Sequence, residues 1–212
     1  MIYIFKRSFY LFLTIPFFAV GKIYYYFNLD NFRSDFQKVA ISVESRRKDI
    51  PESFIQALII AEDHRSTFHF GIDHIAMMRA VFVRVYKNEY EGASTIEQQF
   101  IRAVISRYER TFWRKFREQL LAVLVRETYS VQKISQTYLT IAFYGSGLEG
   151  INCFLSRKKK EVLNFNCLEV YMLIARLKYP EPLRYKVQEW EVRIANRVRY
   201  MKKRLNQIAS KT

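Results

Sequence analysis

The feature that most limits how this chain can fold is an apolar run near its N-terminus. Lys6 and Arg7 precede the uncharged segment SFYLFLTIPFFAVG, and after Lys22 the residues IYYYF follow. Ser8 to Phe27 is 20 residues, enough for a helix to cross about 30 Å of hydrocarbon. We therefore expect the chain to begin with a membrane-spanning helix.

The residues around this run indicate its orientation. Lys6 and Arg7 favour a cytoplasmic N-terminus and place everything after residue 28 outside the cytosol. Lys22 lies near the far end, where its side chain can reach the head groups beside the tyrosines. A cleaved signal peptide is the alternative, because Ala19–Gly21 is a small-x-small site. We favour the retained anchor, and the domain leaves the cytosol under either interpretation.

The charge of the chain favours an anionic partner. Lys and Arg number 35 against 20 Asp and Glu, a formal net charge of +15. This excess suits nucleic acid, a lipid head group or a phosphorylated substrate. The apolar N-terminus places the domain in the wrong compartment for nucleic acid, so we expect no nucleic-acid partner and a lipid bilayer as one partner.

Cysteine and histidine give no metal-binding pattern. Two cysteines, Cys153 and Cys167, allow a disulfide in an oxidising compartment but do not make a framework. The three histidines, His64, His69 and His74, are spaced by five residues, which does not stack two imidazoles on one helical face. We predict no metal site.

The remainder of the chain reads mostly as helix. We expect a cytoplasmic start and anchor over 1–28, a polar linker or irregular segment over 29–48, and one domain over 49–212. No internal repeat and no alternating pattern of several strands is present. The expected helices cover residues 51–63, 72–88, 95–106, 112–128, 131–143, 167–177 and 188–208.

The segment GASTIEQQF, residues 92–100, contains two adjacent glutamines. Their role is in question, because two amides do little for a core and nothing for net charge. Ser94 and Glu97 have the spacing of a capping box at the start of a helix. The apolar stripe of this helix consists of Ile96, Phe100, Ala103 and Val104. The opposite stripe consists of Thr95, Gln98, Gln99 and Arg102. Taken alone, that second stripe is more easily explained as a solvated surface than as a binding site.

Two acidic positions bear on this choice. Glu62 and Asp63 follow an apolar helix, where partial burial suits a carboxylate to act as a general base. Glu118 lies on a helix with Arg114 four residues earlier and Arg117 beside it. For each there is a simpler explanation, a surface acid in the first case and a helix ion pair in the second.

The order of these segments resembles the peptidoglycan glycosyltransferases, the family 51 glycosyltransferase domain of bifunctional penicillin-binding proteins, and its monofunctional form most of all. EDHRSTFHFGID is similar to the family's E-D-x-x-F-x-x-H-x-G-x-D, and GASTIEQQFIR to G-G-S-T-I-x-Q-Q-L-x-K/R. RKFRE is similar to R-K-x-x-E. ISQTYLTIAFYGSGLEGI and CLEVYMLIARLKYPEPLRY resemble two later motifs. The five motifs stand in the family's order between about residues 45 and 205.

The chain departs from the family pattern at several positions. The family's Y-F-G-K segment is missing, and FLSRKKK occupies its neighbourhood. The set S-x-x-K, S-x-N and K-T-G of a transpeptidase is not assembled. The substituted positions are Ser66 for Phe, Ala93 for Gly, Glu97 for Thr, Gln136 for Glu and Thr140 for Asn.

The resemblance implies a mainly α, lysozyme-like, two-lobed helical domain, here preceded by one transmembrane helix. It implies a single-pass protein of the inner (cytoplasmic) membrane with its catalytic domain on the periplasmic or external face. The implied substrates are lipid II and the glycan strand on undecaprenyl pyrophosphate, joined by an inverting β-1,4 transfer. Other cell-wall synthesis or division proteins are implied as partners.

The resemblance also assigns roles to residues. Glu62 matches the general base that deprotonates the GlcNAc 4-hydroxyl, and Glu118 matches a second catalytic glutamate on the donor side. No tightly bound cofactor is implied, but a divalent Mg or Mn ion at the pyrophosphate is allowed. The matching substrate-binding positions are Asp63, His69, Ser94, Thr95, Gln98, Gln99, Arg102, Arg110, Arg114, Lys115 and Arg117, of which the five cations would neutralise the leaving pyrophosphate.

Two other functions fit part of the pattern. A lysozyme-like hydrolase would share a glutamate in a sugar cleft, but it has no need of STIEQQ or of the cations in RKFRE. A divergent, inactive homologue would bind lipid II or a division protein as a scaffold. The segment 68–90 is apolar and aromatic, which suits either the membrane interface or the core of the domain.

Overall fold

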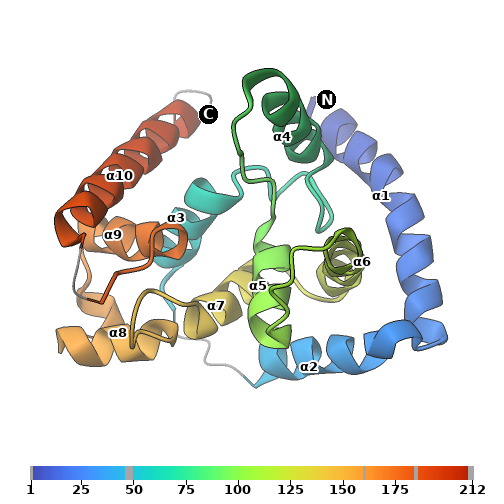
Figure 1. Cartoon of the computed structure of the whole chain (residues 1–212), viewed down its shortest axis with the longest axis horizontal. Helices are drawn as coiled ribbons and strands as arrows, with labels where there is room; N and C mark the ends of the chain where they lie inside the picture. Colours follow the sequence, from blue (N-terminus) through green and yellow to red (C-terminus); the bar gives the residue numbers. More distant parts are fainter. Residues whose placement is uncertain (1, 46–49, 160, 184–185, 210–212) are drawn as a thin grey trace. The chain divides into compact units, whose positions relative to one another are not determined.

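The computed structural model describes residues 2–45, 50–159, 161–183 and 186–209. These residues form α-helices and two short 3-10 helices, with isolated bridges but no β-strand among them (Figure 1). The predicted mainly α class is confirmed. The helices are α1 (Ile2–Tyr26), η1 (Leu29–Asn31), α2 (Phe32–Glu44), α3 (Glu52–Glu62), α4 (His74–Lys87), α5 (Ile96–Ile105), α6 (Phe112–Thr128), α7 (Val131–Ile141), α8 (Gly150–Lys158), η2 (Val162–Asn164), α9 (Cys167–Lys178) and α10 (Val187–Ala209).

The chain divides into two compact units, as a two-lobed domain would. Unit 1 consists of Met1–Ser45 and Arg65–Ile134, and unit 2 of Arg46–His64 and Ser135–Thr212. Each unit is therefore assembled from two separate stretches of sequence. The two thiols of unit 2, Cys153 and Cys167, are free and exposed.

Unit 1 is organised around α6. Along this helix, Leu120, Leu121 and Val125 are completely buried, and α1, α2 and α5 pack against it (Figure 1). Burial all around one segment is expected for a helix that lies at the centre of a helical unit. Helix α6 therefore provides a fixed frame for the side chains that it carries.

Helix α2 replaces most of the linker that we expected over 29–48, so the expectation of an irregular segment was wrong for residues 32–44. Its sequence is polar overall, but Phe32, Val39 and Val43 fall on one face and are buried. This narrow apolar stripe packs on α5 and α6. Residues 46–49 of the expected linker lie outside the described part of the chain.

Helix α1 lies along unit 1. It is the one helix among the described residues that is long and apolar enough to cross a membrane. Gly21 packs so closely on α6 that a Cβ there would lie 3.4 Å from the carbonyl oxygen of Leu120. Tyr10 is buried and its hydroxyl donates to Asp73 at 2.8 Å. The other face of α1 is exposed and apolar, with Phe12 71% exposed.

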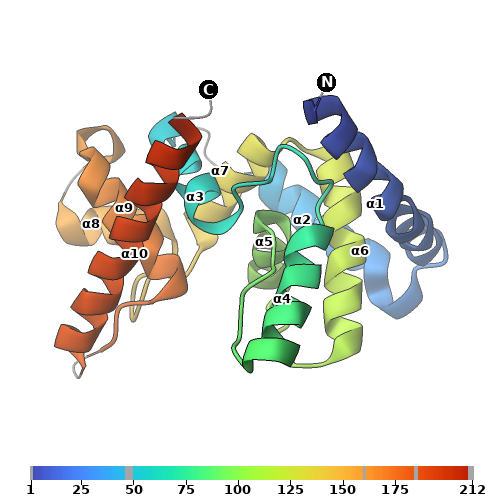
Figure 2. The same cartoon turned by 90° about the horizontal axis from the view of Figure 1, so that it is seen from above.

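Unit 2 is built from α3, α9 and α10, which pack on one another (Figure 2). Leu58 of α3 and Ile174 of α9 are completely buried in its core, as is Met201 of α10. Gly150 begins α8 with a φ of 75°, and a Cβ there would lie 2.2 Å from the carbonyl oxygen of Thr140. Glycine is required at this position because any side chain would overlap that backbone.

Segment 68–90 contains both core and surface residues: Ile72 and Ala76 are buried, whereas one face of helix α4 is exposed. Its apolar residues Met78, Val81, Phe82 and Val85 are between 54% and 70% exposed. They are therefore not core residues. Contiguous exposed apolar side chains mark a surface that contacts a membrane or a partner.

Candidate active site

A cluster of charged side chains in unit 1 surrounds Glu118, which is 4% exposed. Its Oε1 accepts hydrogen bonds from Lys115 Nζ at 2.7 Å and from Arg102 Nη2 at 2.9 Å. Its Oε2 accepts from Arg114 Nη1 at 2.5 Å and from Arg102 Nε at 3.0 Å. Arg114 and Lys115 precede Glu118 by about one turn of α6, whereas Arg102 comes from α5. We call these four residues the Glu118 cluster.

The Glu118 cluster carries more positive than negative charge. Burial alone would raise the pKa of Glu118, but the hydrogen bonds and charges of Arg102 and Lys115 hold that pKa below its ordinary value. Burial lowers the pKa of Lys115, and the neighbouring Glu118 opposes this effect. Three cations around one carboxylate leave a positive surplus, which suits a phosphate-containing ligand.

Two uncharged acceptors, the side chains of Ser94 and Gln98, adjoin the cluster. Lys115 Nζ donates to Ser94 Oγ at 3.0 Å and to the Gln98 side-chain oxygen at 2.6 Å. Ser94 Oγ also lies 3.5 Å from Arg102 Nη2. The polar stripe of α5 thus meets the cations of α6. Gln98 is completely buried, so this face of α5 is not a solvated surface.

The start of α5 differs from the expected capping box. Helix α5 begins at Ile96, and Thr95 is the N-cap, whose hydroxyl accepts from the Gln98 backbone N–H. Glu97 is completely buried and forms an ion pair with Arg126 of α6 at 3.3 Å. The capping box between Ser94 and Glu97 was therefore wrong, because α6 supplies a partner that the local sequence does not reveal.

Thr95 and Gln98 also fix the loop before α4. The Thr95 hydroxyl donates to the carbonyl of Gly71 at 2.9 Å, and the Gln98 amide does so at 3.3 Å. Gly71 has a φ of 90°, and a Cβ there would lie 2.5 Å from the carbonyl oxygen of Ala122 in α6. His69 is buried, and its Nδ1 accepts from the Gly71 N–H at 3.3 Å. His69, Thr95 and Gln98 thus hold a backbone loop against α5 and α6.

Three predicted residues of unit 1 lie elsewhere. Arg117 is buried and directs its guanidinium to Asp35 at 2.7 Å and to Asp30 at 3.0 Å, away from Glu118. Arg110 is exposed between α5 and α6, and Gln99 is half-buried on α5. The structure therefore brings Arg102, Arg114 and Lys115 into the Glu118 cluster and gives Arg117 a supporting contact with α2.

In unit 2, Glu62 ends α3 beside a cation from the last helix. Arg197 Nη2 of α10 donates to Glu62 Oε1 at 2.9 Å and also bonds the carbonyl of Ala61. The neighbouring Asp63 is 4% exposed, and its N–H bonds the carbonyl of Ile59. Sequence reasoning missed Arg197, because it is one of several cations in α10 and lies 135 residues from Glu62.

The helical fold and the positively charged cluster around a buried carboxylate define a site that suits a phosphate-containing ligand. The chain belongs to the transglycosylase family, whose sequence model, described as Transglycosylase, matches residues 31–206. This match contains every predicted site residue, including Glu62 and Glu118. It bears out the resemblance noted in the sequence.

Several curated proteins resemble the chain. Penicillin-binding protein 1A of Aquifex aeolicus is 39% identical over 103 residues, which is 48% of this chain and 14% of that protein. Penicillin-binding protein 1A of Haemophilus influenzae is 36% identical over 130 residues, 61% of this chain and 15% of that protein. Penicillin-binding protein 1B of Vibrio cholerae is 33% identical over 111 residues, 51% of this chain and 14% of that protein. The chain thus matches about one seventh of the length of these relatives.

Proposed function

We propose that the chain polymerises peptidoglycan glycan strands at a membrane surface. It transfers the growing strand from undecaprenyl pyrophosphate to the GlcNAc 4-hydroxyl of lipid II, with inversion and formation of a β-1,4 bond. The observation that carries this proposal is the positive surplus of the Glu118 cluster, within a chain of the transglycosylase family. A hydrolase that cuts glycan strands has no phosphate to neutralise.

On the donor side, the Glu118 cluster binds the pyrophosphate that leaves. As the bond between the sugar C1 and the phosphate oxygen breaks, negative charge grows on that oxygen. Arg102, Arg114 and Lys115 are held in place by Glu118 beforehand, so they need not reorganise when the charge develops. Ser94 and Gln98 fix the position of Lys115, and through it the position of the phosphate.

On the acceptor side, Glu62 takes the proton of the 4-hydroxyl while that oxygen bonds to C1 of the strand. The pyrophosphate-lipid departs with the electron pair of the broken bond. Arg197 and the carbonyl contact beside it hold the Glu62 carboxylate in one orientation. A general base works only when it is positioned within hydrogen-bond reach of the proton it removes, so this contact supports the role of Glu62.

A divalent ion, if it takes part, comes with the pyrophosphate. Each carboxylate oxygen of Glu118 already accepts two hydrogen bonds, one from Arg102 and one from Lys115 or Arg114. The Glu118 cluster therefore does not offer a set of ligands for a Mg or Mn ion. We propose that no cofactor is tightly bound. The side chains then carry most of the neutralisation of the leaving group.

The membrane holds both substrates, and we propose that α1 and the exposed face of α4 keep the protein there. The single crossing of the inner membrane expected over Ser8 to Phe27 involves a helix that packs along α6 in unit 1. In this proposal α1 keeps that packing and enters the inner membrane through its exposed apolar face, with the catalytic residues on the outer side. The apolar outer face of α1 and residues Met78 to Val85 of α4 support it. Cell-wall synthesis or division proteins are the partners that such an enzyme would meet.

Polymerisation of labelled lipid II by the purified chain in detergent tests the proposal, with Glu62→Gln as the matched variant. We expect long glycan strands from the wild type and none from Glu62→Gln. Survival of intact lipid II with both proteins would reject the enzyme and favour a scaffold that binds lipid II. Shortening of preformed strands would instead indicate a hydrolase.

A further inference from the structure

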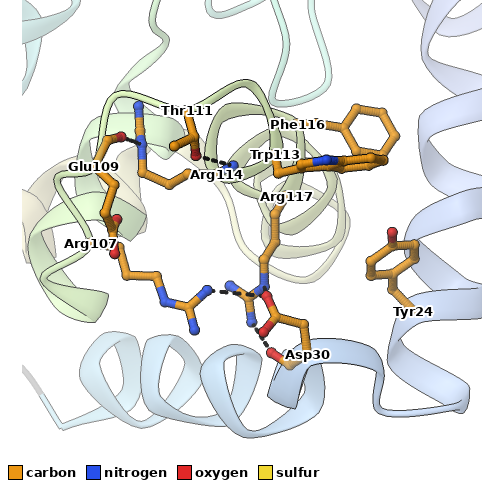
Figure 3. A pocket seen from close by; sticks show the side chains of 9 residues that line it. All are labelled: Tyr24, Asp30, Arg107, Glu109, Thr111, Trp113, Arg114, Phe116 and Arg117. Carbon is orange, nitrogen blue, oxygen red and sulfur yellow. Dashed lines mark hydrogen bonds and ion pairs between the residues drawn. The ribbon is translucent and has the colours of Figure 1, made fainter.

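A cavity in unit 1 adjoins the Glu118 cluster. It has a volume of about 450 Å³, within the range of about 300–1,000 Å³ that is usual for ligand pockets. The pocket lies between the end of α1, η1 and the first half of α6 (Figure 3). We call it the α1–α6 pocket.

The α1–α6 pocket has two chemically different sides. Tyr24, Trp113 and Phe116 form an aromatic side, and these rings lie together in Figure 3. The other side is charged and consists of three arginines and two acids, namely Arg107, Arg114, Arg117, Asp30 and Glu109. Arg107 Nη1 lies 3.2 Å and Arg117 Nε 3.0 Å from Asp30 Oδ2. A ligand that fills this space must be charged at one end and apolar at the other.

The aromatic side is held in place by α1 and α2. The Phe116 ring packs on Phe17 of α1 with centroids 6.1 Å apart, and Tyr24 packs on Phe32 of α2 at 5.7 Å. Gly21 lets α1 approach the backbone of α6 within the same turn of helix. The pocket is therefore part of the packed unit and requires α1 for one of its walls.

The charged side leads to the Glu118 cluster. Arg114 lines the α1–α6 pocket and also bonds Glu118 Oε2. A smaller cavity of about 20 Å³ shares Arg107, Arg114 and Arg117 with the pocket and is lined by Glu118 as well. A phosphate at the Glu118 cluster therefore lies next to a space whose far side is aromatic.

We propose that the α1–α6 pocket holds the isoprenoid units next to the pyrophosphate of the lipid-linked substrate. This role rests on the proposed function, which supplies a pyrophosphate joined to an isoprenoid chain. Aromatic rings bind such a chain by burying its methyl and methylene groups. Beyond the pocket, Phe27 and Phe112 are 66% and 77% exposed and give the rest of the isoprenoid an apolar path towards a bilayer.

Binding of geranyl pyrophosphate and of inorganic pyrophosphate, measured by calorimetry on the full chain, tests this inference. We expect the wild type to bind geranyl pyrophosphate about tenfold more tightly, because the pocket buries the chain. Trp113→Ala and Tyr24→Ala should each remove most of that preference and leave the affinity for inorganic pyrophosphate unchanged. Trp113 is 69% exposed, so its removal does not open the core.

Tyr26→Ala is the control, because Tyr26 is 74% exposed on α1 and does not line the pocket. Equal affinity of the wild type for both ligands would overturn the inference, as would an equal loss of preference in Tyr26→Ala. Tight binding of dihexanoyl phosphatidylglycerol at the same site would also overturn it, by showing a general lipid site. Polymerisation of lipid II without a geranyl preference rejects the pocket alone, whereas the preference without polymerisation rejects the enzyme alone.

Discussion

At the scale of single residues, the Glu118 carboxylate holds the three cations of the Glu118 cluster close to one another. Acidic side chains are rarely buried unless they are paired, and this one accepts from Arg102, Arg114 and Lys115. Without it, three cations would repel one another at short range. The carboxylate thus keeps the cluster assembled before a phosphate arrives, in addition to any direct part in the reaction.

This role predicts a pH-dependent stability difference between the wild type and Glu118→Gln. The pKa of Glu118 is lowered in the folded state from its ordinary value of 4.5, so its stabilisation is complete above that value. It is lost as the pH falls through the lower folded value. We expect Glu118→Gln to cost about 1–3 kcal/mol near neutral pH, since its partners are partly exposed.

Urea unfolding from neutral into acid pH measures this difference. The two unfolding free energies should converge as the pH falls below the ordinary glutamate range. Glu161→Gln is the control, because Glu161 is exposed in unit 2. Its unfolding free energy should follow that of the wild type at every pH. A difference in unfolding free energy between the wild type and Glu118→Gln that stays constant down to low pH would contradict this stabilising role of Glu118.

Arg197 gives a second prediction at this scale. Its bond to Glu62 orients the carboxylate, so Arg197→Met should lower kcat about ten- to a hundredfold, the usual range for a misplaced catalytic group. KM for lipid II should change little, because Arg197 is assigned no contact with substrate.

Two further variants serve as controls. Arg197→Lys keeps a cation and should recover part of kcat. Arg199→Met should have no effect, because Arg199 bonds only Asn196 in the described contacts. A rise in KM with unchanged kcat would indicate a binding role instead.

How far the sequence determines these residues depends on where their partners lie. The motifs located Glu118 and Lys115, and helical spacing placed Arg114 beside Glu118. Arg117, which was expected beside Glu118 as well, pairs with Asp35 instead. The partners of Thr95 and Gln98 are at Gly71, 24 and 27 residues away, and no local pattern reveals such contacts. The two amides that prompted the first question have different surroundings: Gln98 is buried against Gly71 and Lys115, and Gln99 is half-buried.

At the scale of elements, apolar periodicity predicted the helices with broad apolar faces. Helix α6 was expected over 112–128 and extends over Phe112–Thr128. Helix α2 was missed because its buried stripe is narrow and most of its residues are polar. The start of α5 was misassigned by one residue, since both Ser94 and Thr95 are good N-caps and tertiary contacts chose Thr95.

The packing of α1 on α6 predicts an effect of bulk at Gly21. Gly21→Leu would place four heavy atoms where a Cβ already lies 3.4 Å from Leu120 O and from Leu124. We expect a loss of about 1–3 kcal/mol, as for other overpacked interfaces, and faster proteolysis after α1. Ala19→Leu, on the exposed face of the same helix, controls for hydrophobicity. Equal melting temperatures for the two variants would show that α1 does not depend on α6.

At the scale of the whole molecule, the charge and the apolar surfaces were predicted to different degrees. The net charge of +15 is a property of composition and needs no structure. The segment 68–90 could not be assigned from sequence, because an apolar helix stripe looks the same in a core and at a membrane surface. Only the position of α4 in unit 1 leaves Met78 and Phe82 exposed.

These properties predict how the chain binds vesicles. The full chain should bind phosphatidylglycerol vesicles, and salt should weaken binding only in part, because screening removes the electrostatic contribution and leaves the apolar one. Replacing Met78 and Phe82 together by Gln should reduce the salt-resistant part about tenfold or more. Replacing Leu163 and Leu168, which are 79% and 47% exposed in unit 2, removes two apolar side chains elsewhere and should have a much smaller effect.

Cosedimentation at low and high salt measures both contributions. If the two double variants lose the same salt-resistant binding, α4 has no special place at the membrane, and α1 alone accounts for the attachment.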